Sequence, residues 1–501
     1  MRRTQGRVVT RPAAGRIVDN RLRDSFLGID IGTSSAKALL RQESREESVR
    51  APFASDPLGP AAWLEGCREA VARLRERAGR ALDRVAGIGL SGQTNTYVLW
   101  SPDRGDRELP VIPWSHGGGR AELAELLRLP ASFFVDHISM QHPAMVSYPA
   151  PRILWMQRTL GSEWQAADRV LQPKDWAYLR LTGSCASDPF TWRGLAHLGD
   201  ASFHGELLDR LGLEAGRLPE LHAAWAAPGR LTREAAGYLG LRSGVPVVLG
   251  CNDFFASLLG MGSLGPGDWF DVAGSSEHVG RIETRSPLSV TTPLVYGPCL
   301  AHNVHYGVTA ASGVSLDWAL QAFGADKPAA GDARAPLFLP YLQGERAPLF
   351  DPDARGVLFG VDRGHGPRDL LYAVCEGVAF SLLQIAALID SEATDPVRTS
   401  LDGPLAEPVT QLKADVFQRP FHVVRQKACA ALGAAMLAAV GAGLFASPVD
   451  AAREWAAVER VVEPRPERAR LLRERYELYE SLYLALKASF GALARLKGEA
   501  E

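Results

Sequence analysis

Leu27-Gly28-Ile29-Asp30-Ile31-Gly32-Thr33-Ser34-Ser35-Ala36-Lys37 is the stretch of sequence that decides the fold. Its apolar first half predicts a buried strand over residues 26–31, and the small polar residues after it predict a turn. The amides and hydroxyls of such a turn can donate hydrogen bonds to phosphate oxygens, and Asp30 at the strand end is placed to hold a magnesium ion. Taken alone, the stretch is also compatible with an ordinary strand-to-turn junction.

The same arrangement recurs in the second half of the chain. An apolar strand is predicted at 245–249, and residues 269–273 lead into a second small turn, Gly274-Ser275-Ser276. Alternation of short apolar runs with helical stretches is typical of an α/β protein. Two such turns predict two similar lobes facing one another across a nucleotide cleft. We expect a basic tail over 1–24, a first lobe over 25–244 and a second lobe over 245–501.

Composition sets the broad class of protein. The chain has 501 residues, of which 46% are hydrophobic and 22% charged, as in soluble globular proteins of two or three domains. The 55 basic and 57 acidic residues give a formal charge of −2, which indicates no nucleic-acid partner. The six cysteines lie singly without a CxxC motif, which predicts reduced thiols and a cytoplasmic location.

Two segments test whether the chain is secreted or membrane-bound. The first 24 residues hold seven arginines and no long apolar run, so we expect a disordered basic tail rather than a secretory signal. Residues 429–446 carry no charge and are long enough to raise the question of a membrane span. Alanine and glycine dominate this run, which favours a tightly packed internal helix. We therefore expect no association with a membrane.

Further motifs follow in a fixed order along the chain. After Asp30 and its turn come Gly89-Leu90-Ser91-Gly92-Gln93, the segment 147–155, Pro173-Lys174-Asp175, Leu181-Thr182-Gly183, Gly250-Cys251-Asn252-Asp253, Pro266-Gly267-Asp268 and the long block 338–380. In this order they resemble the FGGY family of carbohydrate kinases, from Phe26 to beyond Phe445, with xylulokinases closest in pattern. The resemblance implies a two-lobed actin-like ATPase (ribonuclease H-like) fold, in which each lobe is a mixed sheet with flanking helices.

The resemblance also implies roles for individual residues. Phosphoryl transfer to an alcohol needs a base that accepts the hydroxyl proton, and the matching residue here is Asp253. An alternative for Asp253 is capping of the next helix, since Asp is a preferred N-cap. Asp30 would organise Mg²⁺. The substrate would contact Gln93, Thr94, Trp114, Asn252 and Asp253. The phosphates and nucleoside of ATP would contact Gly32, Thr33, Ser34, Lys37, Gly274, Ser275, Ser276, Gly313 and Gly403.

Several positions depart from the family pattern. Thr94-Asn95 stands where xylulokinases have Met-His and glycerol kinases have Arg-Glu, which disfavours glycerol as the substrate. His116 occupies the place of a carboxylate in the element that begins at Trp114. The adenosine segment keeps Gly403 but continues with Pro404, which has no N–H and a fixed φ. ATP remains the expected donor, and we expect weaker recognition of its base.

The sequence leaves three functions of the protein to be distinguished. The leading hypothesis is an ATP-dependent kinase of a ketose or polyol, with a ketopentose such as xylulose first. The alternative is a kinase-like sugar-binding regulatory protein with little or no ATP turnover. An actin-like assembly or chaperone ATPase is disfavoured by the specific block 338–380. The expected partners are a small-molecule sugar or polyol, ATP and Mg²⁺, without nucleic acid or membrane, and a homodimer is left open.

Overall fold

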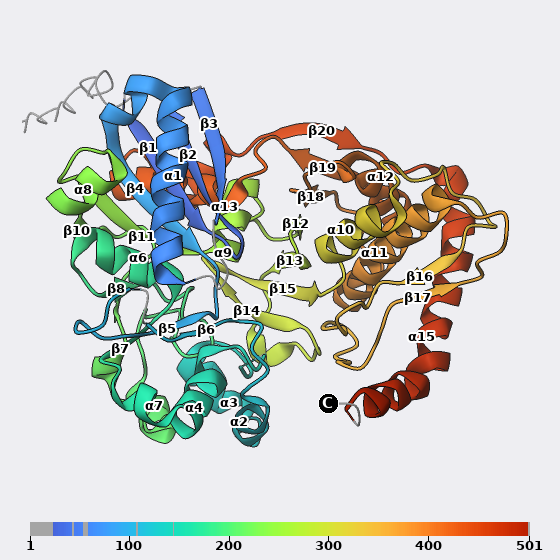
Figure 1. Ribbon diagram of the computed structural model, residues 1–501, viewed down its shortest axis with the longest axis horizontal. Coiled ribbons are helices and arrows are strands. Elements are labelled where there is room, and N and C mark those ends of the chain that lie inside the picture. The colour runs from blue at the N-terminus through green and yellow to red at the C-terminus, as the bar shows by residue number, and fades with distance from the viewer. Residues whose placement is uncertain (1–23, 43–44, 54–58, 107–108, 144, 499–501) are drawn as a thin grey trace, which may run out of the picture.

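The computed structural model describes residues 24–498, with gaps at 43–44, 54–58, 107–108 and 144. The predicted basic tail therefore lies outside the described residues, apart from Asp24. The described chain forms two lobes, each built around a mixed sheet with flanking helices (Figure 1). The predicted two-lobed α/β architecture is confirmed.

The first sheet has six strands in the order β10-β11-β4-β1-β2-β3. Strands β1, β2 and β3 are an antiparallel meander, whereas β1, β4 and β11 run parallel to one another. Every residue of β1 is buried, as expected for the apolar run that occupies the middle of the sheet. The bounds are β1 Ser25–Ile31, β2 Ser35–Gln42, β3 Arg45–Pro52, β4 Val85–Gly92, β10 Gly229–Arg230 and β11 Pro246–Asn252.

The second sheet has seven strands in the order β14-β15-β13-β12-β18-β19-β20. Strand β12 pairs antiparallel with β13 and parallel with β18, just as β1 pairs with β2 and β4. The internal repetition predicted from the two small turns is therefore present in the topology. The bounds are β12 Trp269–Val272, β13 Glu277–Glu283, β14 Val295–Cys299, β15 His302–Thr309, β18 Val397–Thr399, β19 Phe421–Val424 and β20 Val458–Val462.

Helices cover both faces of the first sheet because side chains alternate along β1. Leu27, Ile29 and Ile31 share one core with the helices α1 (Pro60–Ala78), α6 (Pro173–Thr182) and α8 (Arg233–Leu239). Phe26 packs in a different core, with α9 (Asp253–Met261), α13 (Cys429–Gly441) and α14 (Pro448–Trp455). Asp30 lies on the same face of β1 as Phe26 and Gly28.

Helix α13 comes from the C-terminal part of the chain but packs against the first sheet (Figure 1). Glycines make this close contact feasible: a Cβ on Gly28 would lie 1.8 Å from the carbonyl oxygen of Ala431, and one on Gly89 would lie 1.9 Å from that of Ala434. The uncharged run 429–446 thus contains an internal helix, as expected. The boundary at residue 245 has to be moved, because β11 and α9 also belong to the first lobe.

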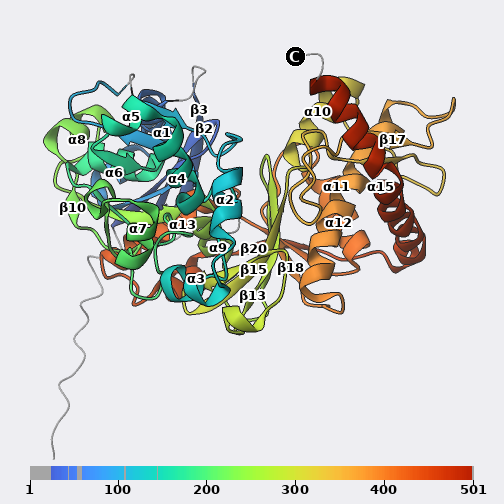
Figure 2. The ribbon, with the colours of Figure 1, turned by 90° about the horizontal axis from the view of Figure 1, so that it is seen from below.

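The second lobe holds the helices α10 (Gly313–Phe323), α11 (Pro367–Asp390), α12 (Ala406–Phe417) and α15 (Ala469–Gly498). Figure 2 shows β13 and β15 between the first lobe and the helices α11 and α12. Of the described helices, α11 alone has the length and composition of a membrane span, but 72% of its most apolar window is buried inside the protein. It is the central helix of the second lobe's core.

The remaining elements are mostly short. Helices α2, α3, α4 and α7 lie together in the first lobe (Figure 1). Their bounds, with those of the other elements, are α2 Arg120–Leu126, α3 Ala131–Ile138, α4 Pro149–Thr159, α5 Gly161–Gln165, α7 Gly205–Leu211, β5 Tyr97–Trp100, β6 Val111–Ile112, β7 Arg169–Leu171, β8 Ala186–Ser187, β9 Glu220–Leu221, β16 Leu337–Leu339 and β17 Val357–Phe359, and single 3₁₀ turns at Gly79–Arg84, Ala215–Arg217, Pro287–Ser289 and Pro466–Arg468.

Candidate active site

Three parallel strands of the first sheet end at one edge. Because β1, β4 and β11 run in the same direction, their carboxyl ends bring together segments that are far apart in the sequence. The register pairs Asp30 with Ser91, and Gly92 with Asn252. Asp30 and its turn, Gln93-Thr94 and Asn252-Asp253 therefore share this edge.

Asp253 is the first residue of α9 and is not its cap. The cap is Asn252, whose Oδ1 accepts a hydrogen bond from the amide of Phe255 at 3.0 Å. The carboxylate of Asp253 accepts the amide of Phe254 at 2.8 Å. Burial, reinforced by the negative charge of Asp30, raises the pKa of Asp253 to about 7. A carboxylate with such a pKa is suited to accept a proton at neutral pH.

Asp30 is buried and only partly neutralised. Its Oδ1 accepts a hydrogen bond from Ser91 Oγ at 3.1 Å, and its Oδ2 lies 3.5 Å from Lys37 Nζ. Carboxylate oxygens are the protein ligands that Mg²⁺ prefers, and this ion usually binds through one or two carboxylates and the substrate phosphates. Asp30 lies near enough to Asp253 for its negative charge to raise the pKa of Asp253. These residues fit a magnesium ion.

The first phosphate turn, between β1 and β2, presents its hydroxyls to solvent. The amide of Gly32 donates to the carbonyl of Ser35 at 3.0 Å, which closes the turn. Thr33 and Ser34 are exposed, and Ser34 Oγ accepts from Arg50 Nη2 at 3.2 Å. Lys37 lies on β2 with 36% of its side chain exposed. The predicted group is therefore assembled at the end of β1.

The second phosphate turn, between β12 and β13, is closed by helix α10. The amide of Gly313 donates to the carbonyl of Gly274 at 3.1 Å, and a Cβ on Gly313 would lie 2.5 Å from that oxygen. Only glycine fits this approach. The N-terminus of α10 thus lies beside Ser275, and helix N-termini favour anions.

Gly403 lies at the same edge of the second sheet. It follows β18, which runs parallel to β12, so both strands deliver their turns to one side. Gly403 has a φ of +103° and an exposed surface with no atom near its missing Cβ. Val409, six residues after Gly403 in the same segment, is instead buried in the core of the second lobe. Its side chain therefore does not face a nucleotide.

A buried ion-pair network lies behind the second turn and was missed in the sequence. Lys413 Nζ lies 2.8 Å from Asp271 Oδ2 and also contacts Glu277, and Thr399 Oγ1 donates to Asp271 at 2.8 Å. Asp271 occupies the position in β12 that Asp30 occupies in β1. The nearby positive charge of Lys413 lowers the pKa of Asp271 although its burial acts in the opposite direction. No local motif joins residues that lie 142 positions apart.

The predicted substrate residues divide into two groups. Thr94 and Asn252 line a cavity where the first lobe meets Tyr306 of β15; its empty space, including the part open to solvent, is about 310 Å³. Gln93 is turned inward: its Nε2 donates to the carbonyl of Gly32 at 3.3 Å, and its Oε1 accepts from Thr96 at 3.3 Å. The cavity is also lined by Asn95, Met145, Tyr148, Arg193, Phe254, Phe255 and Tyr306.

Gln172 is a further residue that the sequence did not single out. Its Oε1 accepts the amide of Asn95 at 2.7 Å and the hydroxyl of Thr94 at 3.4 Å. Its Nε2 donates to the carbonyl of Thr191 at 2.7 Å. Gln172 therefore fixes the segment that follows β4. It caps α6, which was recognisable from Gln172-Pro173 and Asp175.

Trp114 lies outside the cavity wall and forms a contact across the lobes. The guanidinium of Arg346, from the second lobe, lies 4.6 Å from the centre of its ring. His116, which replaces a carboxylate, is held by the buried Arg152: Nη1 lies 3.0 Å from His116 Nδ1 and Nη2 donates to its carbonyl at 2.7 Å. The element that begins at Trp114 is thus anchored within the first lobe.

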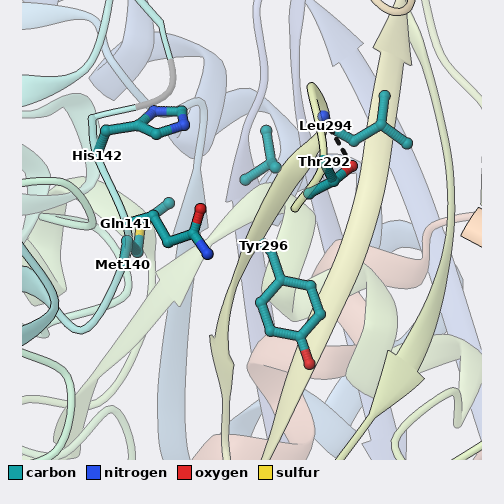
Figure 3. A pocket seen from close by; sticks show the side chains of 7 residues that line it. Met140, Gln141, His142, Thr292, Leu294 and Tyr296 are labelled. Carbon is teal, nitrogen blue, oxygen red and sulfur yellow. Dashed lines mark hydrogen bonds between the residues drawn. The ribbon is translucent and has the colours of Figure 1, made fainter. Parts of the chain in front are cut away.

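A second, smaller cavity of about 230 Å³ lies where Met140-Gln141-His142 meets the segment 292–296 (Figure 3). Figure 3 shows the amide of Gln141 extending toward Tyr296. Gln141 Nε2 donates to the carbonyls of Pro287 and Val290, the latter at 2.5 Å. This contact joins the lobes.

Histidines form few candidate metal sites in the described part of the chain. His305 is buried and bonds Thr292 at 2.9 Å, and His302 is not in a group suited to a metal. The group with ligand geometry there is His197, Asp200 and His204. None of these three lines the cavity.

Comparison with known proteins shows the family of the chain. The model of the FGGY carbohydrate kinase N-terminal domain matches residues 25–260, and that of the C-terminal domain matches residues 272–442. The xylulose kinase of Escherichia coli (strain K12) is 31% identical over 448 residues, covering 83% of this chain and 90% of that protein. The xylulose kinase of Bacillus subtilis (strain 168) is 26% identical, covering 92% and 97%.

Solved structures show the same fold. A ligand-bound xylulose kinase from Lactobacillus acidophilus superposes with a TM-score of 0.78 at 24% identity, covering 94% of this chain and 100% of that chain. Two family models span most of the sequence, residues 25–260 and 272–442. The chain belongs to the FGGY family of carbohydrate kinases.

Proposed function

We propose that this kinase transfers the γ-phosphate of ATP to a hydroxyl of a ketose or polyol, with a ketopentose such as xylulose as the first candidate. The observation that supports this proposal is the place of Asp253 in the sequence of the strand edge: it directly follows Asn252, which lines the cavity and lies at the same edge as Asp30. Burial and the charge of Asp30 raise its pKa to about 7. The relatives that share most of the chain's length are xylulose kinases, which supports the sugar class.

Asp253 acts as the base. It accepts the proton of the attacking hydroxyl while Asn252, the residue before it, lines the sugar cavity. Its position at the start of α9 is rigid because Asn252 caps the helix and also donates to the carbonyl of Phe190 at 2.7 Å. A positioned base contributes about two to four orders of magnitude to the rate.

The two turns hold the phosphates from opposite lobes. Thr33 and Ser34 approach from the first lobe, whereas Ser275 and the N-terminus of α10 approach from the second. Asp30 would hold Mg²⁺, which when bound neutralises the charge that develops on the phosphoryl oxygens. Closure of the lobes brings the two sets of donors to one triphosphate.

The test is ADP release by the purified protein with ATP, Mg²⁺ and a panel of ketoses and polyols. We expect turnover with at least one sugar and a fall of about 10²- to 10⁴-fold in kcat for Asp253→Asn. Asp136→Asn, a change of an acidic residue on α3, is the matched control and is expected to keep full activity. Binding of a sugar without ADP release from the natural chain would instead support the regulatory alternative.

A further inference from the structure

Arg193 is a buried guanidinium without a partner for its terminal nitrogens. The residue is 5% exposed and lines the interlobe cavity. Its Nε donates to Met140 Sδ at 3.3 Å, but neither Nη1 nor Nη2 has a hydrogen-bond partner among the described residues. Within that part of the chain no carboxylate lies within ion-pair distance of Arg193.

Among the described residues, Arg152 and Arg419 are also buried with one unpartnered nitrogen each, Nε and Nη2, but Arg193 is the buried arginine with both terminal nitrogens unpaired. Three other buried cations have carboxylate partners. Lys174 Nζ lies 2.9 Å from Asp175 and 3.1 Å from Asp188, and Lys413 likewise contacts two carboxylates. Arg475 pairs with Glu376 at 2.6 Å. An unpaired buried charge is costly for a folded protein, so the exception at Arg193 requires an explanation.

Aromatic rings do not replace the missing partner. The guanidinium lies 5.1 Å from the centre of the Phe255 ring and 5.6 Å from that of Tyr306. Such contacts use the face of the guanidinium, whereas its N–H donors lie in the plane. The planar donors are suited to a carboxylate, which accepts two parallel hydrogen bonds.

The cavity places Arg193 next to the reaction site. Asn252, which immediately precedes the base Asp253, lines the same cavity, as does Thr94. The hydroxyls of Tyr148 and Tyr306 face each other there at 3.5 Å and are available to sugar hydroxyls. Arg193 and Asn252 thus line one cavity, and Asn252 is followed directly by Asp253.

We propose that Arg193 binds a carboxylate of the acceptor, so that the preferred substrate is an open-chain sugar acid rather than the neutral ketose of the same length. This inference rests on the proposed kinase function but replaces the neutral ketose, its first candidate acceptor, with a sugar acid. The proton of the phosphorylated hydroxyl still goes to Asp253, and the carboxylate takes no part in bond making.

The experiment measures kcat/KM by ADP release for xylonate and gluconate against xylulose and fructose, with ribulose 5-phosphate as the phosphate-bearing probe. We expect the better sugar acid to exceed the better ketose by at least about tenfold. Arg193→Gln is expected to lower kcat/KM for the sugar acid by about 100-fold and for the ketose by less than threefold. Arg193→Lys, which keeps the charge but not the planar pair of donors, is expected to fall between these values.

Arg210→Gln is the matched control, because Arg210 also lies over a ring, that of Phe133 at 5.2 Å, but is exposed. A higher kcat/KM for the ketoses, or an equal loss for acids and ketoses in Arg193→Gln, overturns the inference and leaves the kinase function standing. A preference for ribulose 5-phosphate over both acids overturns the carboxylate in favour of a phosphate.

Calorimetric titration with the same sugars in the absence of ATP separates the two proposals. If no sugar gives ADP but xylonate or gluconate binds about 100-fold more weakly to Arg193→Gln, the kinase function fails and the role of Arg193 stands. If neither acid binds to the natural chain, the inference fails. Melting temperatures of the Arg193 variants show whether a loss of binding reflects a loss of folding. If Arg193→Gln does not fold, the affinity of Arg193→Lys for the sugar acids is compared with that of the natural chain instead.

Discussion

The two phosphate turns are built on the same topology but use their strand carboxylates differently. In the first lobe Asp30 lies 3.5 Å from the half-exposed Lys37 and acts on Asp253. In the second lobe Asp271 lies 2.8 Å from Lys413, which is fully buried and also contacts Glu277. Both carboxylates are buried, but the lysine beside Asp30 is partly exposed, whereas the lysine beside Asp271 is fully buried.

This difference distinguishes a carboxylate that is expected to act in the reaction, Asp30, from one that stabilises the fold, Asp271. Asp30 contacts Ser91 through Oδ1 and the partly exposed Lys37 through Oδ2. Asp271 accepts from both Lys413 and Thr399 through Oδ2, which fixes the ends of β12 and β18, while its Oδ1 has no hydrogen-bond partner among the described residues. Under the proposed function, the same strand position serves the reaction in one lobe and the rigidity of the turn in the other.

The largest effect is expected for Lys413→Met. It leaves Asp271 and Glu277 buried without a cation, and breaking a buried pair in this way costs about 3–5 kcal/mol. Lys37→Met, on the exposed side of the first turn, is expected to cost less than about 1 kcal/mol. Urea unfolding of the two variants measures the difference, and equal losses would remove the distinction between the turns.

Asp30→Ala is expected to raise the Mg²⁺ concentration for half-maximal activity about tenfold, since an ion held by few protein ligands depends on each carboxylate. Asp271→Ala is expected to reduce stability with no shift in this requirement. Titration of ADP release with Mg²⁺ provides the measurement. An unchanged requirement in Asp30→Ala would show that the first turn does not hold the ion.

The pH dependence reports on Asp253. Because its pKa is raised to about 7, the base is protonated at lower pH, and kcat/KM is expected to fall about tenfold per pH unit below 7. Folding stability changes in the opposite direction: the folded state binds the proton between about pH 4 and 7 while the unfolded state does not, so Asp253 lowers stability as pH rises through this range. A flat rate profile between pH 5.5 and 7 would exclude Asp253 as the base.

The smallest effect is expected for the choice of nucleotide. Gly403 is exposed without a side chain, and Pro404 offers no N–H, so few polar groups remain to distinguish one base from another. The ratio of kcat/KM for ATP over GTP is expected to stay within about tenfold. A thousandfold preference, about 4 kcal/mol, would mean that other residues build the adenine pocket.

Local sequence patterns predicted those features of the fold that depend on residues close together in the sequence. The buried strand before Asp30, the repeated turns and the α/β class follow from residues within a few positions of each other. Arg193 could not be found in this way, because its surroundings come from Met140, Phe255 and Tyr306, on three separate segments. The network of Lys413 was missed for the same reason.

The lobe boundary was misplaced for a related physical reason. The apolar strand at 245–249 predicts the start of the second lobe because it begins a new alternation of strand and helix. Its pairing with β4 is set by long-range register, which no local pattern specifies. The contact of Gly28 with Ala431 is equally distant in the sequence.

Helix α13 has a consequence for the order in which the protein can be made. The ribosome releases residues 25–261 long before residues 429–441, yet β1 and β4 need those later residues to cover one of their faces. Until then, the face of the sheet that carries Gly28 and Gly89 has no helix packed against it. Since domains usually fold in order of synthesis, this lobe instead waits for nearly the whole chain, and a gene fragment ending at the first family domain encodes a protein without its final layer.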